Sequence, residues 1–285
     1  MTKPEAQLAM KPNTLNTLPL DPHNWSAGLH EACRQLRQSW QTDWCGLPKV
    51  LQLCQQTLHL NTVQDPTVMA LNQFAEQVAQ AMENQALSAT AHAEPAYHNR
   101  LHTADVMVAV TTLMRIQEAH QLAAPEQTWV AALLAAAVAH DYQHPGGVNH
   151  SALSIEKATW LSASSMATAV PAPWRGQLEQ WILHTDPQTV ADNHLQVAHQ
   201  PFEWCAPWCQ VLLNEADILL SSTAEFGPSL STALADEWQK LDFAAHATVA
   251  TPAGRAFFLR SVRFSSPAAQ TLSMPQQVQE QLSSL

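Results

Sequence analysis

The sequence predicts an all-α protein, a compact bundle of many helices, and three observations support this fold class. Of the 285 residues, 46% are hydrophobic, 13% are charged and only 7 are glycine, a composition typical of helices packed around a core. Apolar residues recur at helical spacing along most of the chain, without the sustained alternation of a strand. The chain is also long enough to bury a large core without disulfides.

The domain organisation follows from where this periodicity begins and ends. Residues 1–24 are polar, contain Pro4, Pro12, Pro19 and Pro22, and are expected to form a flexible N-terminal extension. Residues 25–270 are expected to form one helical domain, and residues 271–285 a C-terminal tail. The first three helical patterns, in chain order, are Leu29–Trp40, Val68–Leu87 and Gln127–Tyr142. Further helices are expected at Ser151–Ser164, Trp174–His184, Trp208–Ser221, Leu230–Ala247 and Gly254–Val262.

Charge and cysteine content exclude several classes of function. The net charge is -11, and the 13 Lys and Arg residues are scattered, so we expect neither a nucleic-acid partner nor an anionic membrane surface. The longest apolar run, Val130–Ala139, is about half the length that crosses a bilayer. The five cysteines are odd in number and include no CxxC pair, which favours free thiols and a cytoplasmic location.

The stretch YHNRLHTADV, residues 97–106, carries the first candidate site. At about 100° per residue, a helix here would place His98, His102 and Asp105 on one face, where they could share a site. A histidine pair at this spacing also occurs as ordinary hydrogen-bonded core residues. The stretch alone therefore leaves both interpretations open.

Two further stretches shift the balance towards a metal site. In AAAVAHDYQHPGGVN, a very apolar helix ends on His140 and Asp141, with His144 close behind. Imidazole and carboxylate at the negative end of a helix are well placed to bind a divalent cation. In VLLNEADILLSS, Asp217 lies within an apolar helix, where a carboxylate needs a cation or a donor. The neighbouring Glu215 is expected to face solvent.

Together the three stretches resemble the signature segments of the class I cyclic nucleotide phosphodiesterases, within the HD superfamily of metal-dependent phosphohydrolases. Order and approximate spacing agree, and the resemblance covers roughly residues 70 to 220. It implies the HD/phosphodiesterase-type bundle of helices. The C-terminal third resembles the family much less.

The resemblance also implies a role for each motif residue. The ligands of a first metal, usually zinc, would be His102, His140, Asp141 and Asp217. Asp141 would also bridge to a second ion, usually magnesium or manganese, and His98 would be the general acid. Residues expected near the substrate or behind the ligands are Tyr97, Asn99, Asp105, His144, Asn149, Glu156 and Asp186.

Some of these positions depart from the family pattern. The segment between HPGGVN and HTDP is shorter than in the family, so Glu156 is either a glutamate that supports the second metal or a surface residue. Asp186 either positions water on the second metal or caps a turn before Pro187. The position of the family's purine-binding glutamine falls on Phe257, with Gln270 as a fallback. We therefore expect an apolar base pocket walled by Phe257, Phe258 and Phe264.

The predicted function is hydrolysis of the 3'-phosphoester bond of a cyclic nucleotide, cyclic AMP or cyclic GMP, to the 5'-monophosphate. Two divalent ions would activate water and bind the phosphate, and a histidine, which titrates near neutral pH, would protonate the leaving oxygen. Two alternatives remain: an HD-type phosphohydrolase acting on another nucleotide phosphoester, and an inactive nucleotide-binding sensor. The sequence does not predict the oligomeric state.

Overall fold

The structure, a computed structural model, describes residues 15–88, 94–117, 124–146 and 154–285. This described part contains fourteen α-helices, three short 3-10 helices and no strand, so the predicted all-α class is confirmed. The first helices are α1 (Trp25–Thr42), α2 (Leu47–Thr57), η1 (Leu60–Thr62), α3 (Pro66–Ser88), α4 (Arg100–Gln117) and α5 (Ala124–Ala139). They are followed by α6 (Ile155–Ser164), η2 (Ala167–Ala169), α7 (Ala172–Leu183), α8 (Val190–Val197), α9 (Ala206–Leu219) and η3 (Leu220–Ser222). The last are α10 (Gly227–Lys240), α11 (His246–Val249), α12 (Pro252–Ser261), α13 (Pro267–Thr271) and α14 (Met274–Ser284).

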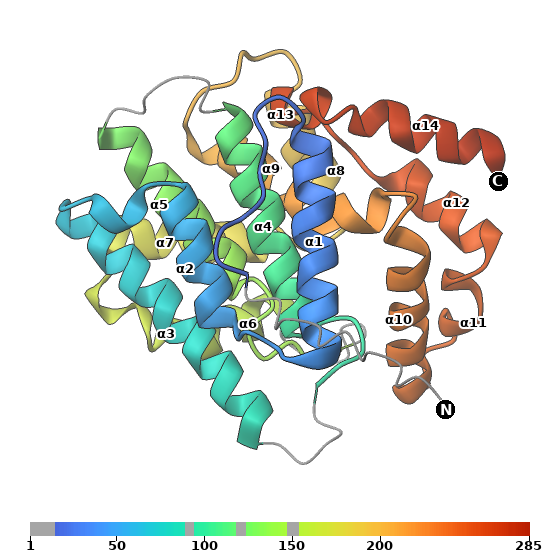
Figure 1. Cartoon of the computed structure of the whole chain (residues 1–285), viewed down its shortest axis with the longest axis horizontal. Helices are drawn as coiled ribbons and strands as arrows, with labels where there is room; N and C mark the ends of the chain where they lie inside the picture. Colours follow the sequence, from blue (N-terminus) through green and yellow to red (C-terminus); the bar gives the residue numbers. More distant parts are fainter. Residues whose placement is uncertain (1–14, 89–93, 118–123, 147–153) are drawn as a thin grey trace, which may run out of the picture.

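Helix α4 lies at the centre of the bundle (Figure 1). It packs against α1, α2, α5, α9 and α13, and every residue from His102 to Met114 is buried. A helix surrounded on all sides must be apolar around its whole circumference. The run Val106–Val110 meets this requirement, and so does the run Val130–Ala139 of α5, which is also fully buried. These two helices therefore bring the first two motifs to one place in the core.

The helices expected from periodicity are present, with some different boundaries. The expected helix Leu230–Ala247 is interrupted, because α10 ends at Lys240 and Asp242 takes a positive φ of 54°. Sequence periodicity missed α2, α8, α13 and α14, which are short or rich in glutamine. No helix in the described ranges combines the length and the apolar character needed to cross a bilayer.

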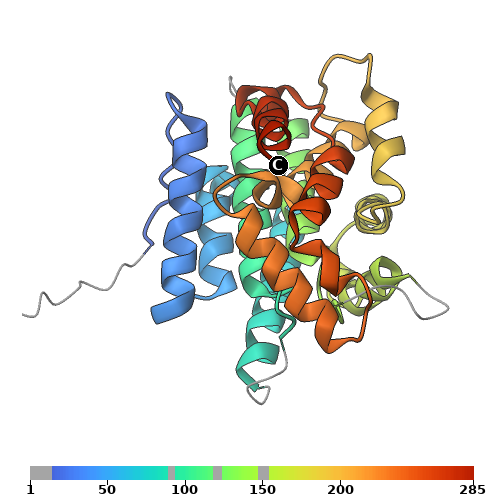
Figure 2. The same cartoon turned by 90° about the vertical axis from the view of Figure 1, so that its right-hand side faces the viewer.

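Both stretches that the sequence analysis set apart from the helical domain contact it. Leu15 and Leu18 are buried in the main core, and so is Met274 at the start of α14. Figure 2, turned by 90°, shows α10, α12 and α14 together on the face towards the viewer, with α1 and α2 to their left. The C-terminal helices therefore cover the face of the bundle next to α9 and α10.

Candidate metal centre and active site

His98 precedes α4 and does not lie on it. Residues 96–99 form bends, and the helix begins at Arg100. The side chain of Asn99 caps this beginning, because its Oδ1 accepts hydrogen bonds from the backbone N–H groups of Leu101 and His102 at 2.9 and 3.1 Å. The prediction that one helix face carries both His98 and His102 is therefore wrong: the cap ends the helix between them.

Asp105 points away from the other motif residues, contrary to prediction. Its two carboxylate oxygens accept hydrogen bonds from the guanidinium of Arg37 on α1, at 2.8 and 2.7 Å. Such a bidentate pair stabilises a buried carboxylate. Asp105 therefore joins α4 to α1, one turn beyond His102, and does not share a site with the histidines.

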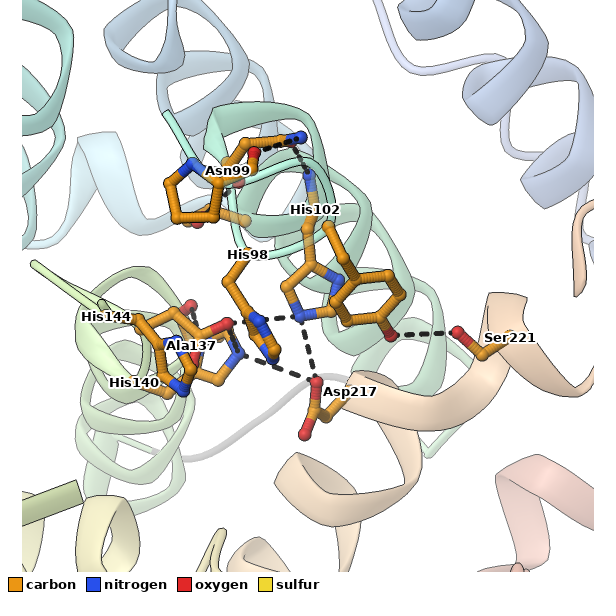
Figure 3. Close-up of polar contacts among 12 residues, drawn as sticks. His98, Asn99, His102, Ala137, His140, His144, Asp217 and Ser221 are labelled. Atoms are coloured by element: carbon orange, nitrogen blue, oxygen red, sulfur yellow. Dashed lines mark hydrogen bonds and ion pairs between the residues drawn. The ribbon is translucent and has the colours of Figure 1, made fainter. Parts of the chain in front are cut away.

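His102 on α4, His140 in the turn directly after α5 and Asp217 on α9 converge (Figure 3). Asp217 Oδ1 lies 3.1 Å from His102 Nε2 and 3.6 Å from His140 Nε2. Asp141 Oδ2 lies 3.2 and 3.3 Å from the same two nitrogens. A tetrahedral ion with ligand bonds of about 2.0–2.1 Å separates neighbouring ligand atoms by about 3.3 Å. His102, His140 and Asp217 thus each place one ligand atom within 4.8 Å of the others, as a group that could hold a metal ion does, and Asp141 lies beside both imidazoles.

Hydrogen bonding around these atoms also fits a metal. His140 Nδ1 donates to the carbonyl oxygen of Ala137 at 2.9 Å, which leaves the lone pair of Nε2 for an ion. Within the described part of the chain, the buried atoms His102 Nε2, His140 Nε2 and Asp141 Oδ2 have no hydrogen-bond partner. Buried polar atoms without partners are costly. A divalent cation among them would remove that cost, so the donor set fits the metal that the resemblance implies.

The charges at this centre determine its titration. Burial lowers the pKa of His102, but contacts with Asp141 and Asp217 outweigh burial and raise it to about 9. The pKa of His140 is raised well above its ordinary value in the same way. Burial would raise the pKa of both aspartates, yet the two histidines lower it well below the usual range. Without an ion, the centre is therefore a cluster of imidazolium and carboxylate groups at neutral pH.

Glu237 on α10 is a site residue that sequence reasoning missed. Its Oε1 lies 2.6 Å from His98 Nδ1, and its Oε2 accepts the backbone N–H groups of Tyr97 and His98 at 2.8 and 3.0 Å. Burial would raise the pKa of Glu237, but these contacts lower it to about 2. Glu237 is therefore an ionised carboxylate, and it accepts a hydrogen bond from the protonated Nδ1 of His98. It lies outside all three motifs, and no local sequence signal marks it.

His144 and Gly146 complete the surroundings of His98. The ring of His144 stacks on that of His98, with centroids 3.9 Å apart and an angle of 23° between planes. Its Nδ1 accepts the backbone N–H of Gly146 at 3.0 Å, and burial lowers the pKa of His144 to about 4. Gly146 takes a positive φ of 73°, and a Cβ there would lie 3.0 Å from the carboxyl group of Glu237. The glycine leaves room for the carboxylate that orients His98.

A cavity of about 520 Å³ opens onto this centre. Its described lining includes four carboxylates and no lysine or arginine; the carboxylates belong to Asp141, Glu156, Asp186 and Asp217. Oε2 of Glu156 is buried without a hydrogen-bond partner among the described residues, whereas Oδ1 of Asp186 accepts the backbone N–H of Gln188 at 2.9 Å. Asp186 thus caps a turn, as one interpretation of that position expects, and also lines the cavity; its role beside a second metal stays a prediction.

The apolar part of the cavity wall comes from unexpected residues. Ile155 at the start of α6 and Leu234 and Trp238 on α10 line it. Contrary to prediction, neither Phe257 nor Phe264 does: Phe257 is 75% exposed, and Phe264 packs against the main core. Phe258 lies under the guanidinium of Arg255.

Three other predicted positions have different outcomes. The amide of Gln270 donates to the carbonyl oxygen of Phe264 at 3.2 Å, and Gln270 does not line the cavity. Asn149 lies outside the described residues. Glu215, expected to face solvent, is completely buried, because α9 is covered on that side by the segment that contains Ser265 and Ser266.

Comparison with known proteins bears on this centre directly. Residues 97–162 match the family model described as 3'5'-cyclic nucleotide phosphodiesterase. The match covers less than a quarter of the chain, and it is this segment that is similar to the family. The match confirms the predicted family and a 3',5'-cyclic nucleotide phosphodiesterase as the enzyme class. It includes His98, His102, His140 and Asp141 of the phosphodiesterase segment, while Asp217 lies beyond its end. Comparisons with the curated proteins and with the solved structures gave no significant match.

We expect the affinity for a divalent ion to rise with pH. The raised pKa values of His102 and His140 mean that an ion must displace a proton from each ring at neutral pH. Titration of the metal-free protein with Zn²⁺ between pH 6 and 8 should show a dissociation constant that falls about tenfold per pH unit for each proton displaced. Asp217→Ala, which removes a ligand, should lose the tight site. An affinity independent of pH would show that the rings are already neutral.

A second prediction concerns Gly146. Gly146→Ala forces a side chain into a left-handed conformation against the carboxyl group of Glu237. We expect a loss of about 1–2 kcal/mol in unfolding free energy and a lower kcat, in the same direction as Glu237→Gln. Gly176→Ala on α7 is the matched control, because a Cβ there meets nothing within 4 Å. Equal kcat values for the Gly146 and Gly176 variants would contradict the role of this contact.

Proposed function

We propose that the protein hydrolyses the 3'-phosphoester bond of a cyclic mononucleotide, cyclic AMP or cyclic GMP, with two divalent ions. The observation that carries this proposal is the pairing of a carboxylate-rich, cation-poor cavity with a histidine oriented by Glu237. A phosphodiester carries negative charge, and four carboxylates would repel it. Cations must therefore occupy the cavity before the substrate can enter.

The described residues provide for two ions. His102, His140, Asp141 and Asp217 would bind the first. Asp141 would also face the second, whose water molecules would be oriented by the carboxylates of Glu156 and Asp186, which line the same cavity. When bound, the two ions lower the pKa of water and neutralise the phosphate oxygens. We assign Zn²⁺ to the first position, because two imidazoles suit it, and Mg²⁺ or Mn²⁺ to the second, where carboxylates dominate.

His98 is the residue best placed to protonate the leaving oxygen. It lines the cavity, and with Nδ1 occupied by Glu237 only Nε2 is left for a substrate. The stacked ring of His144 limits rotation of the His98 side chain. A positioned general acid of this kind contributes about 10²- to 10⁴-fold to a rate.

The purine would contact the apolar wall formed by Ile155, Leu234 and Trp238. Stacking on an indole and contact with aliphatic side chains do not distinguish donors from acceptors on the base. Such a wall discriminates between bases only modestly.

The five unpaired cysteines support a reducing compartment such as the cytoplasm.

A metal assay combined with a hydrolysis screen tests this function. We expect two divalent ions per chain and turnover of both cyclic AMP and cyclic GMP, with kcat/KM values that differ by no more than about a few hundredfold. The screen includes cyclic dinucleotides and nucleoside monophosphates, which report the alternative phosphohydrolase. Turnover of these compounds alone would overturn the proposed substrate. A preference beyond about a thousandfold between cyclic AMP and cyclic GMP would mean that a polar side chain hydrogen-bonds the base.

His98→Gln separates the general acid from the metal ligands. Metal content should stay near that of the wild type, because His98 is not a proposed ligand, while kcat on a cyclic nucleotide falls about 10²- to 10⁴-fold. The kcat on a p-nitrophenyl phosphodiester, whose leaving group needs no proton, should fall much less. Equal losses on both substrates would rule out the acid role.

A further inference from the structure

The helix that carries Asp217 is joined to the C-terminal segment through the buried Glu215. Oε1 of Glu215 accepts the backbone N–H groups of Ser265 and Ser266 at 2.5 and 2.8 Å. Oε2 accepts the hydroxyl group of Ser266 at 2.5 Å. Both Glu215 and Ser266 are completely buried. This carboxylate, two residues before Asp217, thus binds α9 to the beginning of α13.

A buried cation makes the complementary connection just beyond α9. The guanidinium of Arg255, on α12, donates to the carbonyl oxygen of Ser221 and, at 2.9 Å, to that of Thr223. Only 7% of Arg255 is exposed. Gln281 on α14 accepts from the same guanidinium at 2.7 Å and donates to the carbonyl oxygen of Ser222 at 2.8 Å. The negative end of α9 and η3 is therefore capped by a cation from the C-terminal segment.

The capped residues also contact the metal centre from behind. The hydroxyl groups of Ser221 and Tyr97 lie 2.9 Å apart, and the ring of Tyr97 packs on that of His102 with centroids 4.7 Å apart (Figure 3). Arg255 is thus connected to two proposed ligands. It binds the end of the segment that carries Asp217, and it is linked to His102 through Ser221 and Tyr97.

We propose that residues 252–285 position the metal centre, with Glu215 and Arg255 as the positioning residues on either side of Asp217. The inference rests on the metal centre of the proposed function. Neither side chain is a ligand; each binds backbone groups of a neighbouring segment and so restricts where α9 can lie. Residues that orient metal ligands in this way typically affect affinity about 10- to 100-fold when replaced.

The test compares metal affinity with the stability of the metal-free protein. A purely structural contact changes the melting temperature of the folded apoprotein but leaves its dissociation constant for an ion unchanged. A positioning contact changes the dissociation constant as well. We would titrate full-length apoprotein with Zn²⁺ at pH 7.5 against a chromophoric chelator, and follow thermal unfolding by circular dichroism.

For Arg255→Met we expect a dissociation constant for Zn²⁺ that is about 10- to 100-fold higher. Arg255→Lys keeps the charge but not the fork of donors, and should fall between this variant and the wild type. Glu215→Gln keeps the shape of the side chain and should also raise the dissociation constant for Zn²⁺. Arg260→Met and Glu280→Gln are matched controls, because both side chains are exposed on the same C-terminal segment, and their dissociation constants should equal that of the wild type.

Unchanged affinity in folded Arg255→Lys and Glu215→Gln proteins would overturn the proposal, whatever happens to the melting temperature. If Arg255→Met does not fold, these two milder variants decide the question. A wild-type protein that binds no divalent ion would overturn the metal centre itself, which is a different failure and is seen before any variant is made.

Discussion

The buried cluster of two imidazoles and two carboxylates is the constraint on which the rest of this structure depends. Two buried imidazoles and two partly exposed carboxylates lie at ion-pair distances between the core and the cavity, where an uncompensated charge is costly. The cluster is tolerable only if its members keep their spacing, since each one compensates another or a shared ion. Helix α4, the turn after α5 and helix α9 carry these side chains, so the three helices must be held in a fixed relation.

The surrounding contacts meet this requirement with further buried charges. Arg37 and Asp105 join α1 to α4, Glu237 joins α10 to the chain before α4, and Glu215 joins α9 to α13. Between these polar connections the packing is apolar and dense, and all of Val130–Ala139 is buried. The charged connections define distances along the helices, and the apolar surfaces exclude water from them.

The sequence predicted what depends on local spacing and missed what depends on packing over long separations. The apolar stretch before His140 and Asp141 predicted that these polar residues lie at the edge of the core, because their types and their apolar surroundings can be read from one stretch. Glu237 is 139 residues from His98, its partner, so nothing near either residue reveals the pair. Glu215 looked solvent-exposed because its donors are about fifty residues away. The prediction that Phe257 lines the base pocket rested on the family resemblance, which is weakest in the C-terminal third of the chain.

The excess of carboxylates in the cavity has a consequence for the cell as well as for the reaction. A chain deprived of divalent ions presents Asp141, Glu156, Asp186 and Asp217 to any ligand, with no lysine or arginine among the described lining residues, so the carboxylates outnumber the imidazolium of His140. Such a surface repels phosphate. The metal-free protein would therefore neither hydrolyse a cyclic nucleotide nor bind it. The free concentration of the cyclic nucleotide would then not depend on how much metal-free protein is present.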